Sequence, residues 1–203
     1  MTDGTALGVW PDEARGKLLE KIEEAGAAGV DWIQIREKSL SGRDLAALVG
    51  EALRRVPSAC RILVNDRLDV ALTTGAAGVH LGEQSLPIQD VKRLLNAQAK
   101  GAFWSGTSVH SLAAAQAAER GGADYLFFGP VFATPSKAGY GPPQGLERLA
   151  EVCRGVSVPV VAIGGITRQN APSCTAAGAK GVAAIRLFQD AANLKELVNS
   201  LRS

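Results

Sequence analysis

Seven short apolar runs alternate with longer amphipathic stretches along this chain, and the alternation limits the folds that the sequence can adopt. Most of the runs are nearly continuous Val, Ile, Leu and Phe, as expected for parallel strands buried on both faces. Strands that alternate with helices form βαβ units with right-handed crossovers. The sequence therefore predicts an α/β fold of the TIM (β/α)8-barrel type. The predicted strands lie within residues 30–37, 61–66, 78–82, 103–109, 125–131, 159–165 and 181–186.

A (β/α)8 barrel has eight strands, and the strand missing from this count is the first. The opening segment MTDGTALGVW is too short and too polar for a good strand, although residues 5–9 could serve as a poor substitute. We therefore expect a single domain over residues 1–203 that is truncated at strand 1 or lacks most of it. A missing strand exposes strand edges, which we expect a partner strand or a homodimer to cover.

The composition excludes several classes of protein. A formal net charge of +2 without a dense Lys/Arg run argues against nucleic acid as a partner. Three widely spaced cysteines and two histidines argue against a disulfide framework, a zinc site and a multi-histidine metal centre. The sequence contains no apolar stretch of about 18 residues and no signal-peptide pattern at its start, so we expect a cytoplasmic protein that does not enter the membrane.

Polar residues end the first predicted strand, where a barrel of this type places its site. Strand alternation puts Gln34, Arg36 and Lys38 on one face, directed inward, and Ile35 and Glu37 toward the helices. Two cations and an amide inside a barrel need an anionic partner, and a diphosphate would satisfy them. The alternative is an Arg/Lys pair at the rim that bridges to nearby carboxylates.

The second predicted strand ends in Asn65 and Asp66. Next to a diphosphate, the carboxylate of Asp66 is suited to hold Mg²⁺, which takes oxygen ligands and keeps several waters. The alternative is a helix cap, a common role for Asn and Asp at this place, and Asp69 could compete for any metal role.

Two later loops carry groups that suit an anion. Thr134, Ser136 and Lys137 supply two hydroxyls and an ammonium after one predicted strand, although such loops can also be plain surface turns. Gly164 and Gly165 end another strand just before a helix, where backbone N–H groups can approach a phosphate closely. Phosphate sites after the seventh and eighth strands recur in this fold.

Histidine is the side chain best suited to move a proton near neutral pH. His110 follows the predicted strand at 103–109 and is the candidate proton shuttle. The alternative is a hydrogen-bonded histidine in the barrel mouth or a helix cap. His80 lies within a predicted strand, and we interpret it as a packed or rim histidine.

An ordered set of motifs over residues 15–190 resembles one family closely. The chain is similar to the thiamine phosphate synthases (thiamine-phosphate pyrophosphorylases) and to their relatives, the thiazole tautomerases. The motifs are WIQIREKSLSGRDL, ILVNDRLDVAL, GVHLGE, GTSVHSLAAA, GADYLFFGPVFATPSK, PQGLERL, PVVAIGGIT and AGAKGVA. The resemblance implies a Mg²⁺-dependent transferase that couples hydroxymethyl-aminopyrimidine diphosphate to thiazole phosphate and releases pyrophosphate.

The resemblance also implies roles for individual residues. The pyrimidine diphosphate would be held by Gln34, Arg36, Lys38 and Asn65, with Asp66 as a magnesium ligand. The leaving diphosphate would contact Ser108 and Lys137, and the thiazole phosphate would bind Thr134, Ser136 and Gly165.

Three features depart from the family pattern. Synthases usually read HLGQED, and its last Asp is a second magnesium ligand; here that place is held by Ser85, with Glu83 as the nearest substitute. The usual Val-Ser near the thiazole phosphate is Ile185-Arg186. The first strand, which typically ends in Thr-Asp, is represented only by MTD, so we expect a chain that begins late.

These departures keep two alternatives open. Tautomerases also lack the Asp at the Ser85 position, and in a tautomerase His110 would shuttle the proton. Arg186 and the missing strand would instead suit a paralogue that binds a phosphorylated ligand without catalysis.

Overall fold

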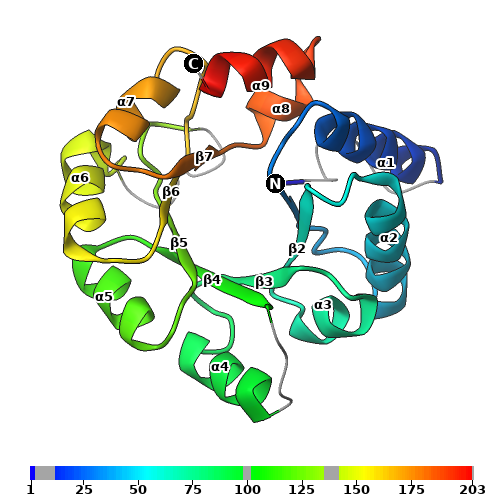
Figure 1. Cartoon of the computed structure of the whole chain (residues 1–203), viewed down its shortest axis with the longest axis horizontal. Helices are drawn as coiled ribbons and strands as arrows, with labels where there is room; N and C mark the ends of the chain where they lie inside the picture. Colours follow the sequence, from blue (N-terminus) through cyan, green and yellow to red (C-terminus); the bar gives the residue numbers. More distant parts are fainter. Residues whose placement is uncertain (3–11, 98–101, 135–141, 203) are drawn as a thin grey trace. The chain divides into compact units, whose positions relative to one another are not determined.

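The computed structural model describes residues 1–2, 12–97, 102–134 and 142–202. Within these residues, helices and strands alternate as the sequence predicts (Figure 1). The strands are β1 (Trp32–Ile35), β2 (Arg61–Asn65), β3 (Gly78–Leu81), β4 (Trp104–Val109), β5 (Tyr125–Phe128), β6 (Val160–Ile163) and β7 (Gly181–Ala183). The helices are α1 (Asp12–Ala27), α2 (Gly42–Arg55), α3 (Leu68–Thr74), α4 (Ile88–Ala97), α5 (Leu112–Arg120), α6 (Gly145–Gly155), α7 (Ala171–Ala176), α8 (Arg186–Gln189) and α9 (Leu194–Arg202).

The strands follow one another in the sheet in chain order, from β1 to β7. Parallel pairing joins β1 to β2 to β3, and β4 to β5 to β6 to β7. Each strand lies inside one of the apolar runs, so the predicted parallel α/β arrangement is confirmed. No further strand precedes β1 in the described part of the chain, and residues 5–9 lie outside it.

The chain divides into two compact units. Unit 1 comprises Met1–His80 and Phe188–Ser203, and unit 2 comprises Leu81–Leu187. The expectation of a single domain stays a prediction.

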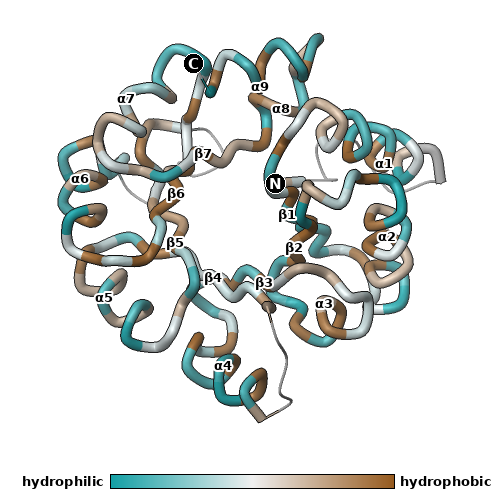
Figure 2. The backbone as a smooth tube through the Cα atoms, viewed as in Figure 1, coloured by the Kyte–Doolittle hydropathy of each residue, from teal (hydrophilic) through white to brown (hydrophobic). Residues whose placement is uncertain are grey.

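The core of unit 1 lies between its strands and α2. Ile62, Leu63 and Val64 of β2 are at most 1% exposed, and Leu48 and Val49 of α2 are fully buried. The buried residues of α2 recur at helical spacing, at Leu45, Leu48, Val49 and Ala52, and its other residues are half-buried or exposed. Brown and teal segments accordingly alternate along the helix in Figure 2. The helix begins after Ser41, whose hydroxyl accepts from the backbone N–H of Asp44.

The core of unit 2 is built around β5, which is buried along its whole length. The ring of Tyr125 occupies the space that a side chain at Gly106 of β4 would need. Beyond β5 the chain stays paired with the end of β6, because Val131 N–H donates to Ile163 O over 2.9 Å and Phe132 N–H donates to Gly164 O over 3.0 Å. These bonds place the loop after β5 directly on the Gly164–Gly165 turn.

Among the described residues, no helix combines the length and the apolar character needed to cross a membrane.

Candidate functional site

In unit 1, the carboxyl ends of β1 and β2 bring together three predicted site residues. β1 and β2 pair in parallel, so their carboxyl ends lie at the same edge of the sheet. Gln34 of β1 therefore lies near Asn65 at the end of β2. Gln34 Nε2 donates to Asn65 Oδ1 over 2.7 Å, and Asn65 Nδ2 donates to Asp66 Oδ2 over 2.6 Å. These residues therefore form one continuous chain of hydrogen bonds.

The backbone at Asp66 is left-handed, with φ of 60°. Asp and Asn adopt this conformation more readily than other non-glycine residues. The turn is fixed by two bonds: Asp66 N–H donates to His80 O over 2.8 Å, and Arg67 N–H donates to Asn65 O over 2.7 Å. As a result, the side chain of Asp66 is exposed just beyond the end of β2.

One exposed carboxylate fits a magnesium ion that takes most of its other ligands from a bound phosphate. Mg²⁺ is usually held by one or two carboxylates together with substrate phosphates and waters, rather than by an all-protein cage. The described residues contain no group of three or more His, Cys, Asp or Glu side chains that could hold a metal. Asp66 therefore fits Mg²⁺ bound together with substrate.

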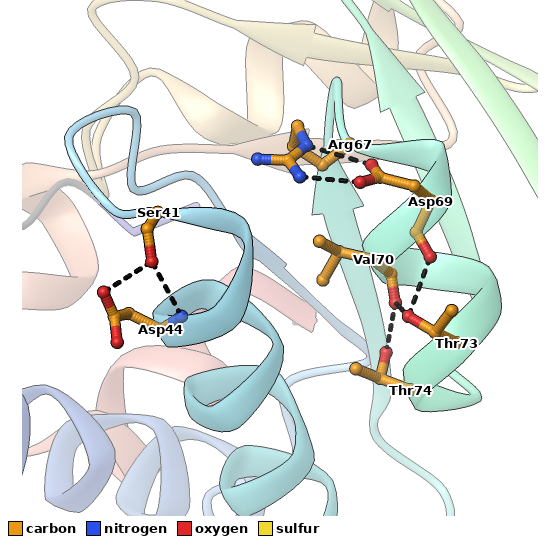
Figure 3. A network of polar contacts seen from close by, with 7 residues as sticks. All are labelled: Ser41, Asp44, Arg67, Asp69, Val70, Thr73 and Thr74. Atoms are coloured by element: carbon orange, nitrogen blue, oxygen red, sulfur yellow. Dashed lines mark hydrogen bonds and ion pairs between the residues drawn. The ribbon is translucent and has the colours of Figure 1, made fainter.

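Asp69, the other candidate carboxylate, is engaged elsewhere. Arg67 donates to both of its oxygens, from Nε over 2.9 Å and from Nη2 over 2.6 Å (Figure 3). This side-chain hydrogen bonding holds the pKa of the Asp69 carboxyl below its usual value. Gly42, at the start of α2, leaves room for the guanidinium, since a Cβ there would lie 2.6 Å from Arg67 Nη2.

Arg36 and Lys38 lie in the loop after β1. The prediction that strand alternation continues to Lys38 is wrong, because β1 ends at Ile35 and alternation holds only while the strand ladder continues. Arg36 is half-buried and Lys38 is exposed. In the described part of the chain neither side chain has an ion pair, so the alternative of a rim pair bridged to carboxylates finds no support there.

Sequence reasoning missed Thr2 and Glu37 as parts of this site. Thr2 N–H donates to Gln34 O over 2.8 Å, and Thr2 Oγ1 donates to Glu37 Oε1 and accepts from Arg36 N–H. Glu37 is 5% exposed and accepts from the Thr2 hydroxyl, and its expected direction toward the helices stays a prediction. The signal was present in the opening Thr-Asp, which suggested the end of a strand beside β1.

His80 is a packed histidine, as predicted. Its side chain is 2% exposed in β3, and its carbonyl oxygen accepts from Asp66 N–H. Burial lowers the pKa of His80 to about 3, against the opposing influence of the Asp66 charge. The imidazole is therefore neutral at physiological pH and supports the strand that holds the Asp66 turn.

In unit 2, His110 lies between a carbonyl and a carboxylate. Its Nδ1 makes a short hydrogen bond to Gly129 O, and its Nε2 lies 3.4 Å from Glu83 Oε1. A carbonyl oxygen only accepts, so Nδ1 carries a proton and Nε2 is the atom that can exchange one. The geometry suits proton transfer at Nε2, but it also suits a histidine that orders the Gly129 turn.

Glu83 and Ser85 differ in what they can offer a metal. Ser85 closes a tight turn, because its hydroxyl accepts from Gly82 N–H over 2.7 Å and its N–H donates to Gly82 O. Glu83 offers an exposed carboxylate directed toward His110. Of the two, Glu83 has the donor chemistry that Mg²⁺ prefers.

The loop after β5 packs closely on the Gly164–Gly165 turn. Both glycines have positive φ, and a Cβ at Gly165 would lie 2.6 Å from Ala133 O. The glycines are therefore required by the packing of this loop, which leads directly to Thr134. A turn rather than a helix follows them, since Thr167 N–H donates to Asn170 Oδ1 and α7 begins at Ala171.

Three further predicted residues of unit 2 lie in its described segments. Ser108 is half-buried near the end of β4, and Ile185 and Arg186 follow β7, with Arg186 exposed at the start of α8. Ser136 and Lys137 lie outside the described residues.

Comparison with known proteins identifies the family of this chain. A family model described as "Thiamine monophosphate synthase" matches residues 8–188. A thiamine-phosphate synthase of Methanoculleus marisnigri is 44% identical over 98% of this chain and 94% of its own length. A putative thiamine-phosphate synthase of Geobacter sulfurreducens is 45% identical over 83% of this chain and 78% of its own length.

Solved structures agree with this assignment. A thiamine phosphate pyrophosphorylase from Pyrococcus furiosus superimposes with a TM-score of 0.83 at 33% identity, covering 99% of this chain and 91% of the other. A 3-hexulose-6-phosphate synthase shares the TIM-barrel-type fold alone, with a TM-score of 0.70 at 18% identity, over 93% of each chain. This chain belongs to the thiamine monophosphate synthase family and is a transferase of thiamine biosynthesis.

Proposed function

We propose that this enzyme joins hydroxymethyl-aminopyrimidine diphosphate to thiazole phosphate in a Mg²⁺-dependent reaction that releases pyrophosphate. The observation that carries the proposal is the half-buried Arg36, which has no carboxylate partner among the described residues and follows the strand that holds Gln34. A guanidinium that follows a strand and has no described carboxylate beside it is suited to bind a diphosphate bidentately.

In this reaction the bond between the pyrimidine methylene carbon and the diphosphate oxygen breaks, and pyrophosphate leaves with the electron pair. The thiazole nitrogen then forms a bond to the methylene carbon. The step requires stabilisation of negative charge on the leaving group more than a general base. Arg36 and Lys38 supply positive charge for this purpose in unit 1, and Ser108 and Lys137 are the candidates in unit 2.

Asp66 is the residue of unit 1 that would hold Mg²⁺. Within unit 2, Glu83 has the carboxylate that Ser85 lacks. When bound, the ion would neutralise charge on the diphosphate as it departs. Asn65 orients the Asp66 carboxylate through its 2.6 Å hydrogen bond.

The thiazole phosphate is assigned to the loop after β5 and to the glycine turn on which it packs. Thr134 and Ser136 offer hydroxyl donors, and Gly164 and Gly165 offer backbone N–H groups. Ile185 and Arg186 replace the usual Val-Ser, and the exposed guanidinium of Arg186 offers a bidentate phosphate contact that a serine hydroxyl lacks.

A coupling assay tests the proposal directly. Both phosphorylated substrates are supplied with Mg²⁺ or with EDTA, and thiamine phosphate is measured. We expect metal-dependent product, and a loss of roughly 100-fold or more in kcat/KM for Asp66→Asn. Product that forms equally well in EDTA would contradict the metal role. Proton exchange into the thiazole in the absence of coupling would instead favour the tautomerase.

The cytoplasmic location and the homodimer stay predictions.

A further inference from the structure

One atom of the Gln34 side chain is buried without a partner. The residue is 3% exposed, and its Nε2 donates to Asn65 Oδ1. Its Oε1 is buried and has no hydrogen-bond partner among the described residues. Buried polar atoms in native proteins are nearly always bonded, so an unpaired acceptor at a candidate substrate site points to a ligand that donates.

The orientation of this amide follows from the residue at the other end of the hydrogen-bond chain. An ionised carboxylate accepts hydrogen bonds and cannot donate them. Asn65 must therefore turn its Nδ2 toward Asp66, which leaves its Oδ1 facing Gln34. Gln34 must then turn its Nε2 toward Asn65, and only its Oε1 remains for a ligand. The oxygen and nitrogen ends of an amide are nearly identical in size, so packing alone would not set this direction.

We infer that Asp66 and Asn65 are positioning residues that fix the polarity of the Gln34 amide, so that the site accepts a ligand with a hydrogen-bond donor at this point. The identity of the ligand rests on the proposed function: its donor would be the exocyclic amine of the aminopyrimidine. We call the chain of hydrogen bonds through Asp66, Asn65 and Gln34 the relay. It involves protein atoms alone and does not depend on the identity of that substrate.

A double-mutant cycle tests the relay without substrate. Gln34→Glu keeps the shape but places an acceptor where Asn65 also presents one. We expect the equilibrium constant for unfolding in urea to rise roughly 30-fold or more. Adding Asp66→Asn supplies a donor at the far end, so all three side chains can reverse their direction. We expect this second change to recover roughly tenfold of that loss.

Asp69→Asn is the matched control. It also removes one carboxylate charge near the end of β2, but its partner is Arg67 and it lies outside the relay. Combined with Gln34→Glu it should recover nothing. Equal recovery by Asp66→Asn and Asp69→Asn would show that only charge matters and would overturn the inference.

A binding experiment tests the donor requirement and does not need the Gln34→Glu variant to fold. Hydroxymethyl-aminopyrimidine and its analogue with oxygen in place of the amine are titrated by NMR without phosphate or metal. We expect the wild type to prefer the amine by roughly tenfold or more. The preference should fall to within roughly threefold in Asp66→Asn and persist in Asp69→Asn.

Equal binding of the two compounds to the wild type, or an unchanged preference in Asp66→Asn, would overturn the inference. If neither compound binds to the wild type, the proposed substrate is wrong, and the unfolding cycle alone decides the relay.

Discussion

The hydroxyl of Thr2 donates to Glu37 Oε1 over 2.5 Å and accepts from the backbone N–H of Arg36 over 2.9 Å. A single side chain thus joins a buried carboxylate to the loop that carries Arg36 and Lys38, the candidate diphosphate-binding residues. Because Thr2 N–H also donates to Gln34 O, the segment continues the hydrogen bonding of β1 beyond its edge.

Thr2→Val should remove both hydroxyl bonds while keeping the shape of the side chain. A buried carboxylate that loses a donor is costly, so we expect the free energy of unfolding to fall by about 2–3 kcal/mol. The KM for the pyrimidine diphosphate should also rise, because the Arg36 loop is less well fixed. Urea unfolding and steady-state kinetics measure the two effects. Thr2→Ser keeps the hydroxyl and should restore most of both; a serine variant as impaired as the valine variant would contradict this role.

Arg36→Ala should reduce kcat/KM of the coupling reaction by roughly 100- to 1,000-fold, since it removes a charged donor from the leaving group. Arg61→Ala is the control, because Arg61 is an exposed arginine at the opposite end of the neighbouring strand β2. It should change the rate less than about twofold. Near-normal turnover in Arg36→Ala would rule out Arg36 as a diphosphate-binding residue.

His110→Ala separates the synthase from the tautomerase. A synthase does not need a proton at His110 Nε2 for coupling, so we expect a loss below about tenfold, compared with the 100-fold to 10,000-fold typical of a general acid or base. The coupling assay used for Arg36→Ala measures it. A larger loss from His110→Ala than from Arg36→Ala would favour proton transfer as the main chemistry.

His80 should make the stability of the protein sensitive to acid. Its pKa is lowered to about 3 in the folded chain and lies near 6.5 when the chain is unfolded. Between these values the unfolded state binds more protons, so the free energy of unfolding falls as pH decreases, by up to about 1.4 kcal/mol per pH unit. Above about pH 6.5 the imidazole is neutral in both states, so His80 costs the folded state no stability. The cost grows as the pH falls and is complete near pH 3.

Urea unfolding at pH 7, 6, 5 and 4.5 checks this pH dependence. His80→Gln should be less stable than the wild type at pH 7 but show a shallower decline with acid. Parallel curves for the two proteins would mean that other groups, such as the carboxylates, account for the whole effect.

Two glycines should respond to alanine in opposite directions. A methyl group at Gly129 would overlap the backbone oxygen of Ile163, which cannot move without disturbing β6, so Gly129→Ala should cost roughly 3 kcal/mol or more. Gly16 lies within α1, and apart from its chain neighbours and the adjacent helix backbone no atom lies within 4 Å of an added Cβ. Gly16→Ala should therefore stabilise the protein by about 0.5–1 kcal/mol. Thermal unfolding of both variants tests the pair, and a well-tolerated Gly129→Ala would contradict the packing described here.

The sequence predicted every strand of the described chain and the edge at which the polar residues gather. These features are local: apolar runs such as RILVN mark buried strands, and polar residues that follow them must lie at the strand ends. The family motifs were equally readable, because each is a short contiguous stretch. The prediction failed after Ile35, because it extended the alternation of inward and outward side chains past the end of β1.

The order of the strands and helices, and the residue types at the carboxyl ends of the strands, could be predicted because both depend on patterns within a few neighbouring residues. Which of those residues contact one another depends on contacts between segments that are far apart in the chain. The Thr2–Glu37 bond spans 35 positions and the Gln34–Asn65 bond spans 31. The left-handed turn at Asp66 is held by the carbonyl of His80 on the next strand. Each partner is brought into reach by strand pairing, and the direction of the hydrogen bonds then follows from which atoms can donate.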